Sequence, residues 1–472
     1  MTSIFGTDGI RGRANQWPMT PDLVLQVGRS IALRFRHDAP LTTASAYKHF
    51  NPYVDHANHQ FTVVIGKDTR LSGYMIESAL VAGLVAEGAN VIMLGPIPTP
   101  AIAMLARSLR ADIGIMISAS HNPYYDNGIK FFDSNGVKFS EEIECEIETI
   151  VKELLSCNSF KQYPIRDCGK SMRLDDAAGR YVEFAKATFP SSLSLEGKKI
   201  VLDCANGAAY KVAPRVFWEL GASVISLGDM PNGRNINEDC GALHPESLQK
   251  CVLEVGADVG IALDGDADRL LLVTKKGQFI NGDQIIALIA SEWSQNGPNE
   301  NERNISKRLK NGVVTTFMSN IGLKKYLEGL GIPHMEADIG DKNVFALMQS
   351  SHCNLGGEES GHIILSDYTT TGDGIIAALQ VLGIVQNRNL DDVFPVFEPY
   401  YQIISSFKLN ESMTDELISN LKHDSETSLG KEGRVVIRKS GTEPLLRVMV
   451  QHKNEQFSKD IFSKLIVPAI TH

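Results

Sequence analysis

Long apolar runs, paired cysteine motifs and an excess of positive charge are all missing from this sequence. Its apolar runs stop well short of the ~18 residues that a membrane helix needs, so we expect no membrane span. The N-terminal segment lacks the apolar core of a signal peptide. The seven cysteines are scattered, odd in number and never spaced as C-x-x-C. This pattern argues against a disulfide framework or a zinc site, and we expect reduced thiols in a cytoplasmic protein.

The net charge of −10 weighs against nucleic acid as a partner, because a phosphate backbone requires a basic surface. A small anionic ligand remains compatible with this charge, since a local cluster of cations in a cleft can outweigh a negative average. The chain of 472 residues is too long for a single core. At about 100–200 residues per domain, its length predicts three or four domains.

A weak internal repeat organises most of the chain. Three segments have the order strand, polar turn, helix, glycine, strand, and they are Val63–Gly95, Ile200–Gly228 and Val313–Gly340. Gly88, Gly221 and Gly331 occupy the same place in each segment, where a left-handed residue would end the helix. Continuous β-branched runs predict strands buried on both faces. We therefore expect three similar α/β domains built on parallel sheets that are covered by helices.

Each repeat is followed by a further strand and then by a loop rich in polar residues. These loops end at Pro123, Arg269 and His362. Ligands of α/β proteins bind outside the carboxyl ends of strands, so we expect the three loops to form one site. The last ~80 residues do not repeat, and Arg434–Gln451 predicts two strands around a tight turn in a smaller α+β domain. The predicted domains are 1–158, 159–278, 279–392 and 393–472, with a surface insertion at His37–Gln60.

The loop after the second repeat carries Asp264, Asp266 and Asp268 at alternate positions. Alternate residues of an extended segment face one way, so the three carboxylates should converge. Three such charges are costly together unless a cation binds, and Mg²⁺ suits three oxygen ligands that leave room for a phosphate. An EF-hand is excluded, because its sixth position would be Arg269 and its twelfth Lys275. Arg269 is instead a candidate phosphate ligand.

The loop after the first repeat contains the candidate nucleophile Ser120. A serine hydroxyl reacts poorly without an activating neighbour. His121 is adjacent in sequence, and Lys130 could direct a cation into the same cleft. We therefore regard these three residues as candidate catalytic groups.

The two remaining loops have the chemistry of sugar and phosphate binding. Glu358, Ser360 and His362 alternate in the third loop, as side chains that hold vicinal hydroxyls would. The C-terminal turn combines a guanidinium, two hydroxyls and backbone N–H groups around a glycine, as a phosphate cradle does. Its candidate residues are Arg438, Ser440, Gly441 and Thr442, with Arg447 beyond the turn.

These four motifs occur in the order found in the α-D-phosphohexomutase superfamily, which the chain resembles over nearly its whole length. The opening FGTDGIRG also resembles that family and places Arg11 where the family has an active-site arginine. Ala267 stands where glycine is common, and Glu359 stands where glutamine is usual. Four phrases resemble the phosphoglucosamine mutase subfamily more than the phosphomannomutases: Lys67–Leu80, Ser118–Phe132, Asn235–Gln249 and Met318–Leu323.

The resemblance implies a heart-shaped molecule of four domains around one deep cleft. It implies an isomerase in which phospho-Ser120 converts glucosamine 6-phosphate to glucosamine 1-phosphate through a 1,6-bisphosphate that turns over in the cleft. One Mg²⁺ per chain would contact the Asp triad and Ser120, a sugar 1,6-bisphosphate would act as activator, and Lys130 with Arg11 would handle the sugar hydroxyl proton.

Such an enzyme would supply UDP-N-acetylglucosamine synthesis and cell-wall precursors. The resemblance permits a homodimer. Two alternatives stay open at this point: a phosphomannomutase/phosphoglucomutase, and a catalytically silent phosphosugar-binding protein.

Overall fold

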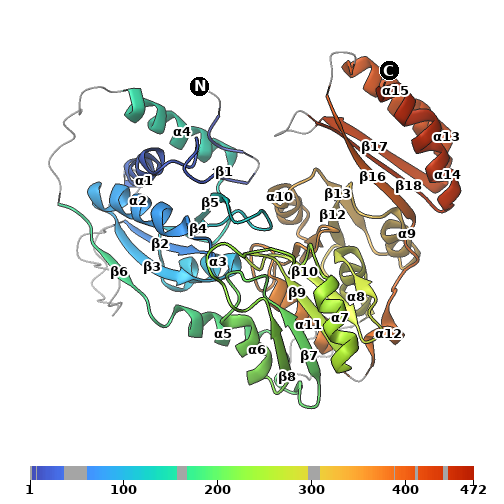
Figure 1. The fold of residues 1–472 in the computed structure, drawn as a ribbon, viewed down its shortest axis with the longest axis horizontal. Helices are drawn as coiled ribbons and strands as arrows, with labels where there is room; N and C mark the ends of the chain where they lie inside the picture. Colours follow the sequence, from blue (N-terminus) through green and yellow to red (C-terminus); the bar gives the residue numbers. More distant parts are fainter. Residues whose placement is uncertain are drawn as a thin grey trace.

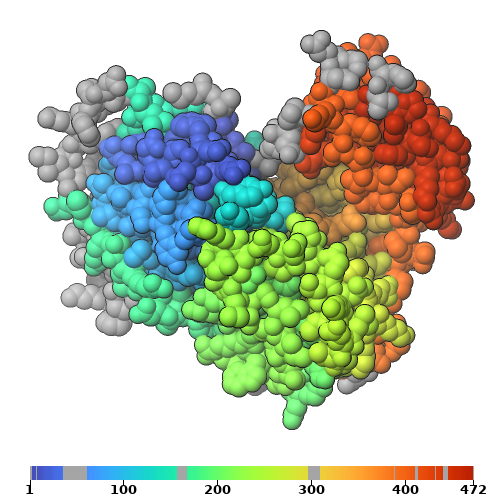
Figure 2. Space-filling view, in the orientation of Figure 1, coloured from blue at the N-terminus to red at the C-terminus, as the bar shows by residue number. Residues whose placement is uncertain are grey.

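The computed structural model describes residues 3–6, 8–36, 61–156, 167–295, 309–386, 388–409, 413–439 and 445–471. The predicted insertion at His37–Gln60 lies outside these residues. Four sheets follow one another along the chain, and the N-terminal and C-terminal units stand on opposite sides of the molecule (Figure 1). The space-filling view in Figure 2 has the outline of a heart, with a notch between these two units.

The first unit is a sheet of six strands in the order β1-β5-β4-β2-β3-β6. Its elements are β1 (Ile10–Arg13), α1 (Pro21–Arg36), β2 (Thr62–Lys67), α2 (Gly73–Ala86), β3 (Asn90–Pro96), α3 (Thr99–Ser108), β4 (Ile113–Ile117), β5 (Asp126–Asp133), α4 (Glu141–Ser156) and β6 (Ser171–Arg173). β6 follows the predicted boundary at residue 158 and still pairs with β3 of this sheet.

The second sheet has the order β11-β10-β9-β7-β8 and the third has the order β13-β12-β14-β15. The second unit comprises α5 (Ala177–Ala187), β7 (Lys199–Asp203), α6 (Val212–Glu219), β8 (Ser223–Leu227), α7 (Glu246–Val255), β9 (Val259–Leu263), β10 (Leu270–Thr274) and β11 (Phe279–Ile280). The third comprises α8 (Gly282–Gln295), β12 (Val313–Thr316), α9 (Ile321–Gly329), β13 (His334–Ala337), α10 (Asp341–Ser351), β14 (Leu355–Gly357), β15 (Ile363–Leu365), α11 (Gly374–Ile384) and α12 (Leu390–Val393).

The fourth sheet has three antiparallel strands in the order β16-β18-β17. Its unit comprises β16 (Tyr401–Lys408), α13 (Asp415–Leu429), β17 (Gly433–Lys439), β18 (Leu445–His452), α14 (Glu455–Ile461) and α15 (Val467–Thr471). The helices lie over one face of this sheet (Figure 1). The prediction of two strands at Arg434–Gln451 is confirmed, and the turn that joins them lies outside the described residues.

The internal repeat is confirmed as β2-α2-β3, β7-α6-β8 and β12-α9-β13. In each copy the two strands pair in parallel, and a third strand adds in parallel to the first. Gly88, Gly221 and Gly331 follow the helices with φ values of 89°, 101° and 68°. A left-handed φ is costly for residues that carry a Cβ, so glycine ends each helix at this place.

The expectation of purely parallel sheets was wrong, because the strand after each polar loop runs antiparallel. β5 pairs with β4, β10 with β9 and β15 with β14 in this way. The loops are too short for a crossover, which a parallel neighbour would require. Each polar loop is therefore the tip of a hairpin that projects from the edge of its own repeat.

One apolar cluster continues through the first three units, each of which also has a cluster of its own, and the fourth unit has a separate core. The continuous core extends from Val64 in β2 to Phe397 just before β16. The separate core joins the inner faces of β17 and β18 to the helices of the C-terminal unit, for example at Val435, Leu446 and Leu421. None of the helices in the described part of the chain has the length and apolar character to cross a membrane.

Helices α1 and α2 cross so closely that glycine is required at the contact. A Cβ on Gly83 of α2 would lie 2.2 Å from the carbonyl oxygen of Leu25 and 2.9 Å from the backbone nitrogen of Arg29. Both neighbours are backbone atoms of α1 and cannot rotate away. This contact fixes the position of α1 against the first sheet.

We expect Gly83→Ala to destabilise the protein by about 1–3 kcal/mol, because the added methyl group forces the two helices apart. Calorimetry should show a lower unfolding temperature, by roughly 2–4 °C for each kcal/mol. Gly179→Ala in α5 is the matched control, since a Cβ there would meet no atom within 4 Å. An equal unfolding temperature for Gly83→Ala and wild type would contradict the close packing.

Candidate active site

Ser120 is held at the tip of the β4–β5 hairpin, against the tip of the next hairpin. Its hydroxyl donates a 2.6 Å hydrogen bond to Oδ2 of Asp264 and lies 3.3 Å from Nδ1 of His121. Ser120 has a φ of 51°, a left-handed conformation that costs a residue with a Cβ roughly 1–2 kcal/mol. Only 2% of Ser120 is exposed. The loop thus holds a buried serine in a strained conformation beside a carboxylate.

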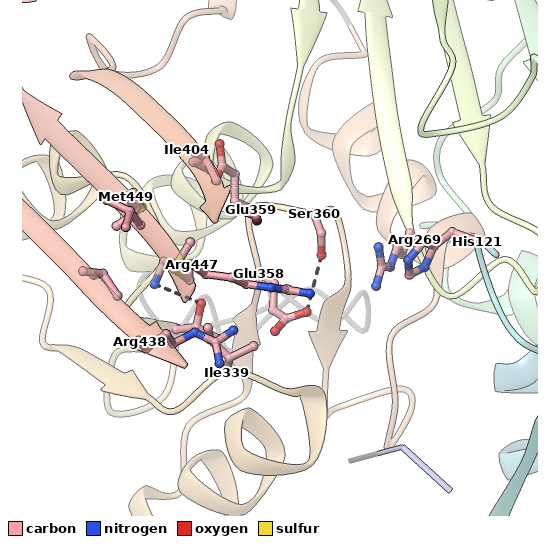
Figure 3. A pocket seen from close by; sticks show the side chains of 15 residues that line it. His121, Arg269, Ile339, Glu358, Glu359, Ser360, Ile404, Arg438, Arg447 and Met449 are labelled. Carbon is pink, nitrogen blue, oxygen red and sulfur yellow. Dashed lines mark hydrogen bonds between the residues drawn. The ribbon is translucent and has the colours of Figure 1, made fainter. Parts of the chain in front are cut away.

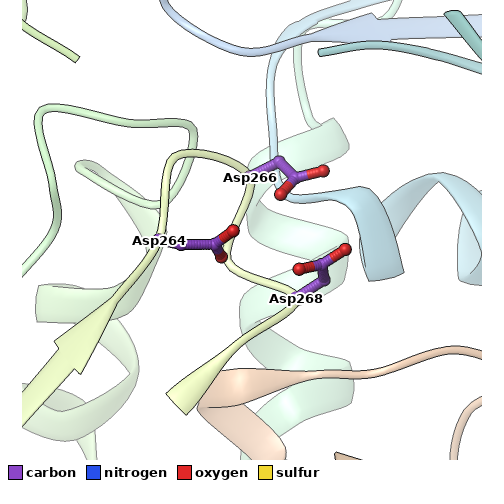
Figure 4. Close-up of side chains that lie close together, drawn as sticks. All are labelled: Asp264, Asp266 and Asp268. Carbon is purple, nitrogen blue, oxygen red and sulfur yellow. The ribbon is translucent and has the colours of Figure 1, made fainter. Parts of the chain in front are cut away.

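Asp264, Asp266 and Asp268 lie on one tight loop after β9 (Figure 4). One carboxylate oxygen from each lies within 4.8 Å of those from the other two, and all three residues are buried. Ala267 turns the loop with a φ of 59°. Glycine adopts this conformation without strain, which explains why glycine is common at this position in the family that the chain resembles. The predicted convergence of the three side chains is confirmed.

Positive charge reaches this loop from the first unit. Nζ of Lys130, on β5, lies 2.8 Å from Oδ2 of Asp266 and 3.1 Å from Oδ2 of Asp268. Burial opposes the charge of Lys130, yet these carboxylates hold its pKa well above its usual range. Burial likewise opposes ionisation of Asp268, but Lys130 and His362 hold the pKa of that carboxyl well below its usual range. Burial and the neighbouring Asp268 and Asp266 raise the pKa of Asp264 to about 8.

The loop fits a hard divalent cation. Oδ1 of Asp266 and Oδ1 of Asp268 are buried and have no hydrogen-bond partner among the residues that the structure describes. Burial, and then repulsion by Asp268 and Asp266, raise the pKa of Asp264, and an added cation would oppose both effects. Three carboxylates of this kind, with the Ser120 hydroxyl beside them, are the oxygen donors that Mg²⁺ prefers.

A series of side chains connects the Asp264–Asp268 loop to the third and first units. His362 places its Nδ1 3.6 Å from Oδ2 of Asp268 and its Nε2 3.6 Å from Oδ2 of Asp341. Asp341 pairs with Lys138, which also contacts Oδ1 of Asp8 at 2.5 Å. Asp8 in turn accepts a 2.5 Å hydrogen bond from Arg11. Because Lys138 and Arg11 offset the charges of Asp341 and Asp8, these groups can be buried where the first and third units meet.

A cavity of about 440 Å³ lies beside the hairpin tips and is lined by all four units. His121 and Arg269 lie on one side, and Glu358 and Ser360 lie between them and the fourth sheet (Figure 3). The Ser360 hydroxyl donates to Oε2 of Glu358 at 3.4 Å. A neutral imidazole faces the cavity, because burial and nearby Arg269 lower the pKa of His121 to about 4.

The uncovered face of the fourth sheet forms the far wall of this cavity. Alternate residues of its three strands face inward, and they are Ile404, Ser406, Val436, Arg438, Arg447 and Met449. Arg438 and Arg447 are directly opposed across β17 and β18. Burial and the charge of Arg447 lower the pKa of Arg438. Two guanidinium groups forced together in this way provide a site for a dianion such as a phosphate.

Family models match each unit in turn. The models described as phosphoglucomutase/phosphomannomutase alpha/beta/alpha domains I, II and III match residues 2–156, 179–277 and 281–400. The model of the C-terminal domain matches residues 407–465. The chain belongs to the phosphoglucomutase/phosphomannomutase family.

Curated relatives within this family are phosphoglucosamine mutases. The protein of that name from Rhizobium etli strain CIAT 652 is 48% identical over 467 residues, which cover 98% of this chain and 97% of the relative. The corresponding protein from Agrobacterium fabrum is 47% identical over 466 residues, with 98% and 97% covered.

Two solved structures share the fold. One is a phosphoglucomutase/phosphomannomutase family protein from Burkholderia thailandensis, with a TM-score of 0.77, 24% identity and coverage of 99% of this chain and 97% of the other. The other is N-acetylphosphoglucosamine mutase from Aspergillus fumigatus, solved in complex with GlcNAc-6P and magnesium, with a TM-score of 0.63, 17% identity and coverage of 99% and 96%.

The structure of this family member divides the predicted site residues into three groups. His121, Arg269, Glu358, Ser360, Arg438 and Arg447 line the cavity. Ser120, Lys130, Arg11 and His362 instead surround the Asp triad and its supporting charges. The predicted residues Ser440, Gly441 and Thr442 lie outside the described residues.

Three functional contacts were missed by the analysis of the sequence. Thr99, at the start of α3, donates to Oδ2 of Asp266 at 2.5 Å. Asn237 donates to the carbonyl oxygens of Ser120 and Asn122 at 2.9 and 3.0 Å. Asp8 joins three cations at the rear of the site. Asp8 and Asn237 lie within phrases that resemble the family, FGTDGIRG and Asn235–Gln249, but the sequence assigned them no role because each acts on a loop of another segment.

We expect Asp266→Asn to weaken Mg²⁺ binding by about tenfold or more, because one of three charged oxygen ligands is replaced by a neutral amide. Isothermal titration of the metal-free protein with MgCl₂ measures this affinity without any substrate. Asp229→Asn provides the control, since Asp229 is an exposed carboxylate of the same unit. Equal Mg²⁺ affinity of Asp266→Asn and wild type would exclude the triad as the metal site.

Proposed function

We propose that this protein is a phosphoglucosamine mutase that interconverts glucosamine 6-phosphate and glucosamine 1-phosphate. The contact that carries the proposal is the 2.6 Å hydrogen bond between the Ser120 hydroxyl and Asp264. It brings a buried nucleophile from the first unit to the carboxylate loop of the second, next to a cavity with phosphate-binding arginines. The identity of 47–48% to phosphoglucosamine mutases over nearly the whole chain supports the choice of substrate.

In the proposed reaction Ser120 carries the phosphoryl group. The free O1 hydroxyl of glucosamine 6-phosphate attacks this phosphorus, the bond between phosphorus and Oγ of Ser120 breaks, and a 1,6-bisphosphate forms. The bisphosphate turns over, and its 6-phosphoryl group returns to Ser120, which leaves glucosamine 1-phosphate. When bound by Asp264, Asp266 and Asp268, Mg²⁺ would supply neutralisation of the charge that develops on the transferred phosphoryl oxygens.

The remaining residues bind and orient the sugar. Glu358 and Ser360 would accept and donate hydrogen bonds to its hydroxyls, and Arg269 would contact the transferred phosphoryl group. Arg438 and Arg447 would hold the phosphate that does not react. Because the reacting and the fixed phosphate occupy different units, the bisphosphate has to turn over before the second transfer.

The attacking sugar hydroxyl has to lose its proton during the transfer, and the acceptor of that proton has to be uncharged beforehand. We assign the sugar hydroxyl proton to Lys130, with Arg11 nearby. The pKa of Lys130 is raised among the buried carboxylates, so the amine can accept a proton only when their charge is offset. His121 and His362 are further candidates, respectively facing the cavity and adjoining Asp268.

Several further features belong to the same proposal. The domain boundaries would lie near residues 158, 278 and 392, and Ser440, Gly441 and Thr442 would complete the phosphate cradle. A sugar 1,6-bisphosphate would act as activator by phosphorylating Ser120. We place the enzyme in the cytoplasm, without nucleic-acid or membrane partners, as a monomer or a homodimer.

A substrate panel with Ser120→Ala tests the proposed function. We expect wild type, phosphorylated at Ser120 alone, to convert glucosamine 6-phosphate with a kcat/KM at least about tenfold above those for glucose 6-phosphate and mannose 6-phosphate. Ser120→Ala should lose essentially all turnover, because the hydroxyl that carries the phosphoryl group is gone. Coupled assays give the rates, and intact-protein mass spectrometry gives the phosphorylation.

Ser108→Ala, which alters an exposed serine at the end of α3, controls for the substitution itself. Preference for mannose 6-phosphate or glucose 6-phosphate would favour a phosphomannomutase/phosphoglucomutase. Binding of phosphosugars without turnover by the phosphorylated protein would favour a silent binding protein and overturn the mechanism.

We expect Arg438→Ala to raise KM by about 10- to 100-fold while kcat changes by less than about threefold. A guanidinium that holds the non-reacting phosphate contributes equally in the ground state and the transition state, so its removal weakens binding alone. Steady-state kinetics with glucosamine 6-phosphate measures both constants. Lys422→Ala removes an exposed cation of α13 and should leave both unchanged. An unaltered KM would show that the fourth sheet does not bind the phosphate.

A further inference from the structure

The largest side chain that is fully buried in the described residues is that of Arg70. It lies in the turn between β2 and α2, directly beneath the loop that carries Ser120. A guanidinium has five N–H donors, and a buried one is costly unless its donors are satisfied and its charge is paired. The partners of Arg70 therefore indicate what it does.

All five donors of Arg70 bind acceptors, and four of these acceptors are backbone carbonyls of the serine loop. Nη2 donates to the carbonyl oxygens of Ser120 and Asn122, both at 2.8 Å. Nη1 donates to the carbonyl oxygens of Pro123 and Asp126. Nε donates to Oδ2 of Asp68 at 2.8 Å. The loop is thus wrapped around the guanidinium.

Asp68 extends this contact to the backbone amide of the nucleophile. Its Oδ2 accepts a 2.7 Å hydrogen bond from the Ser118 hydroxyl, and the Ser118 oxygen accepts a 2.9 Å hydrogen bond from the amide of Ser120. Asp68 is 1% exposed and Ser118 is completely buried. The amide and the carbonyl of Ser120 are therefore both held, directly or through Ser118, by the Asp68–Arg70 ion pair.

We infer that Arg70 is a positioning residue that holds the strained conformation of Ser120, where Asn237 also donates to two of the same carbonyls. The φ of 51° at Ser120 is unfavourable for a residue with a Cβ, and it persists only where the surroundings fix it. Four carbonyl oxygens that point inward would repel one another without a cation between them. Arg70 supplies that cation, and its planar fork fixes the direction of each carbonyl.

Arg70 does not bind the phosphoryl group or the sugar. Each of its donors is already used within the loop, and the residue is not part of the cavity wall. It acts on the reaction only through the placement of the Ser120 hydroxyl against Asp264. Its removal should therefore slow phosphoryl transfer and leave substrate binding to the other units unchanged.

The test compares Arg70→Lys with Arg107→Lys, an exposed arginine of α3. Lysine retains the charge, but its single nitrogen cannot span Asp68 and four carbonyls. Hydrogen–deuterium exchange of the unphosphorylated protein, followed in peptides that cover Ser118–Asn127, reports the loop without any substrate. We expect exchange at least about tenfold faster in Arg70→Lys than in wild type, and unchanged exchange in Arg107→Lys.

The kinetic arm rests on the proposed function. Arg70→Lys should lower kcat by about 100-fold or more, as expected for misplacement by about 1 Å, with KM within about threefold of wild type. The same result, a lower kcat at nearly constant KM, should be obtained with whichever hexose phosphate the substrate panel shows to be preferred. A preference for another substrate would therefore not contradict the inference about Arg70. Wild-type exchange in the loop, or a raised KM at constant kcat, would overturn it.

If Arg70→Lys does not fold, Ser118→Ala provides the test instead. The Ser118→Ala substitution removes only one buried hydroxyl. The amide of Ser120 then loses its link to Asp68, and we expect faster exchange at Ser120 and a lower kcat at constant KM. Exchange and kcat equal to wild type in Ser118→Ala would refute the proposed path from Asp68 to Ser120.

Discussion

The crowding of three buried carboxylates on the loop after β9 is the constraint on which the site depends. Asp264, Asp266 and Asp268 place charge where water cannot screen it. The protein meets this cost with cations from other segments. The ammonium of Lys130 comes from the first unit, and the third unit adds the imidazole of His362 beside Asp268, so both neighbouring units support the loop. The electrostatics of one short loop thus constrain the packing of most of the molecule.

The sequence predicted the features that depend only on residues close together in the chain. The Asp alternation predicted convergence because neighbouring residues of one loop cannot separate far. The glycines after the repeat helices predicted their ends for the same reason, and the two strands of the last unit followed from a run of apolar residues around a polar turn. The turn at Ser440–Thr442 lies outside the described residues, so its part in phosphate binding stays a prediction.

Properties that depend on two distant segments could not be inferred in this way. A strand that is buried on both faces has the same composition whether its neighbour is parallel or antiparallel, so composition did not predict that β5, β10 and β15 add antiparallel to the parallel strands of each repeat. His362 was expected among sugar ligands from its spacing, whereas its packing places it between Asp268 and Asp341. Arg70 lies in a phrase that resembles the subfamily, Lys67–Leu80, but the sequence assigns it no role, and only the fold brings four carbonyls of another loop to it.

The opposed arginines of the fourth sheet also affect how the protein should be handled. Arg438 and Arg447 are directly opposed across β17 and β18, and a tetrahedral oxyanion would relieve their repulsion. If these arginines hold the substrate phosphate as proposed, sulfate and inorganic phosphate would compete with the substrate. A buffer that contains them would occupy the wall of the cavity, lower the apparent affinity for substrate and stabilise the C-terminal unit in a thermal melt. Sulfonate or amine buffers with chloride avoid that interference.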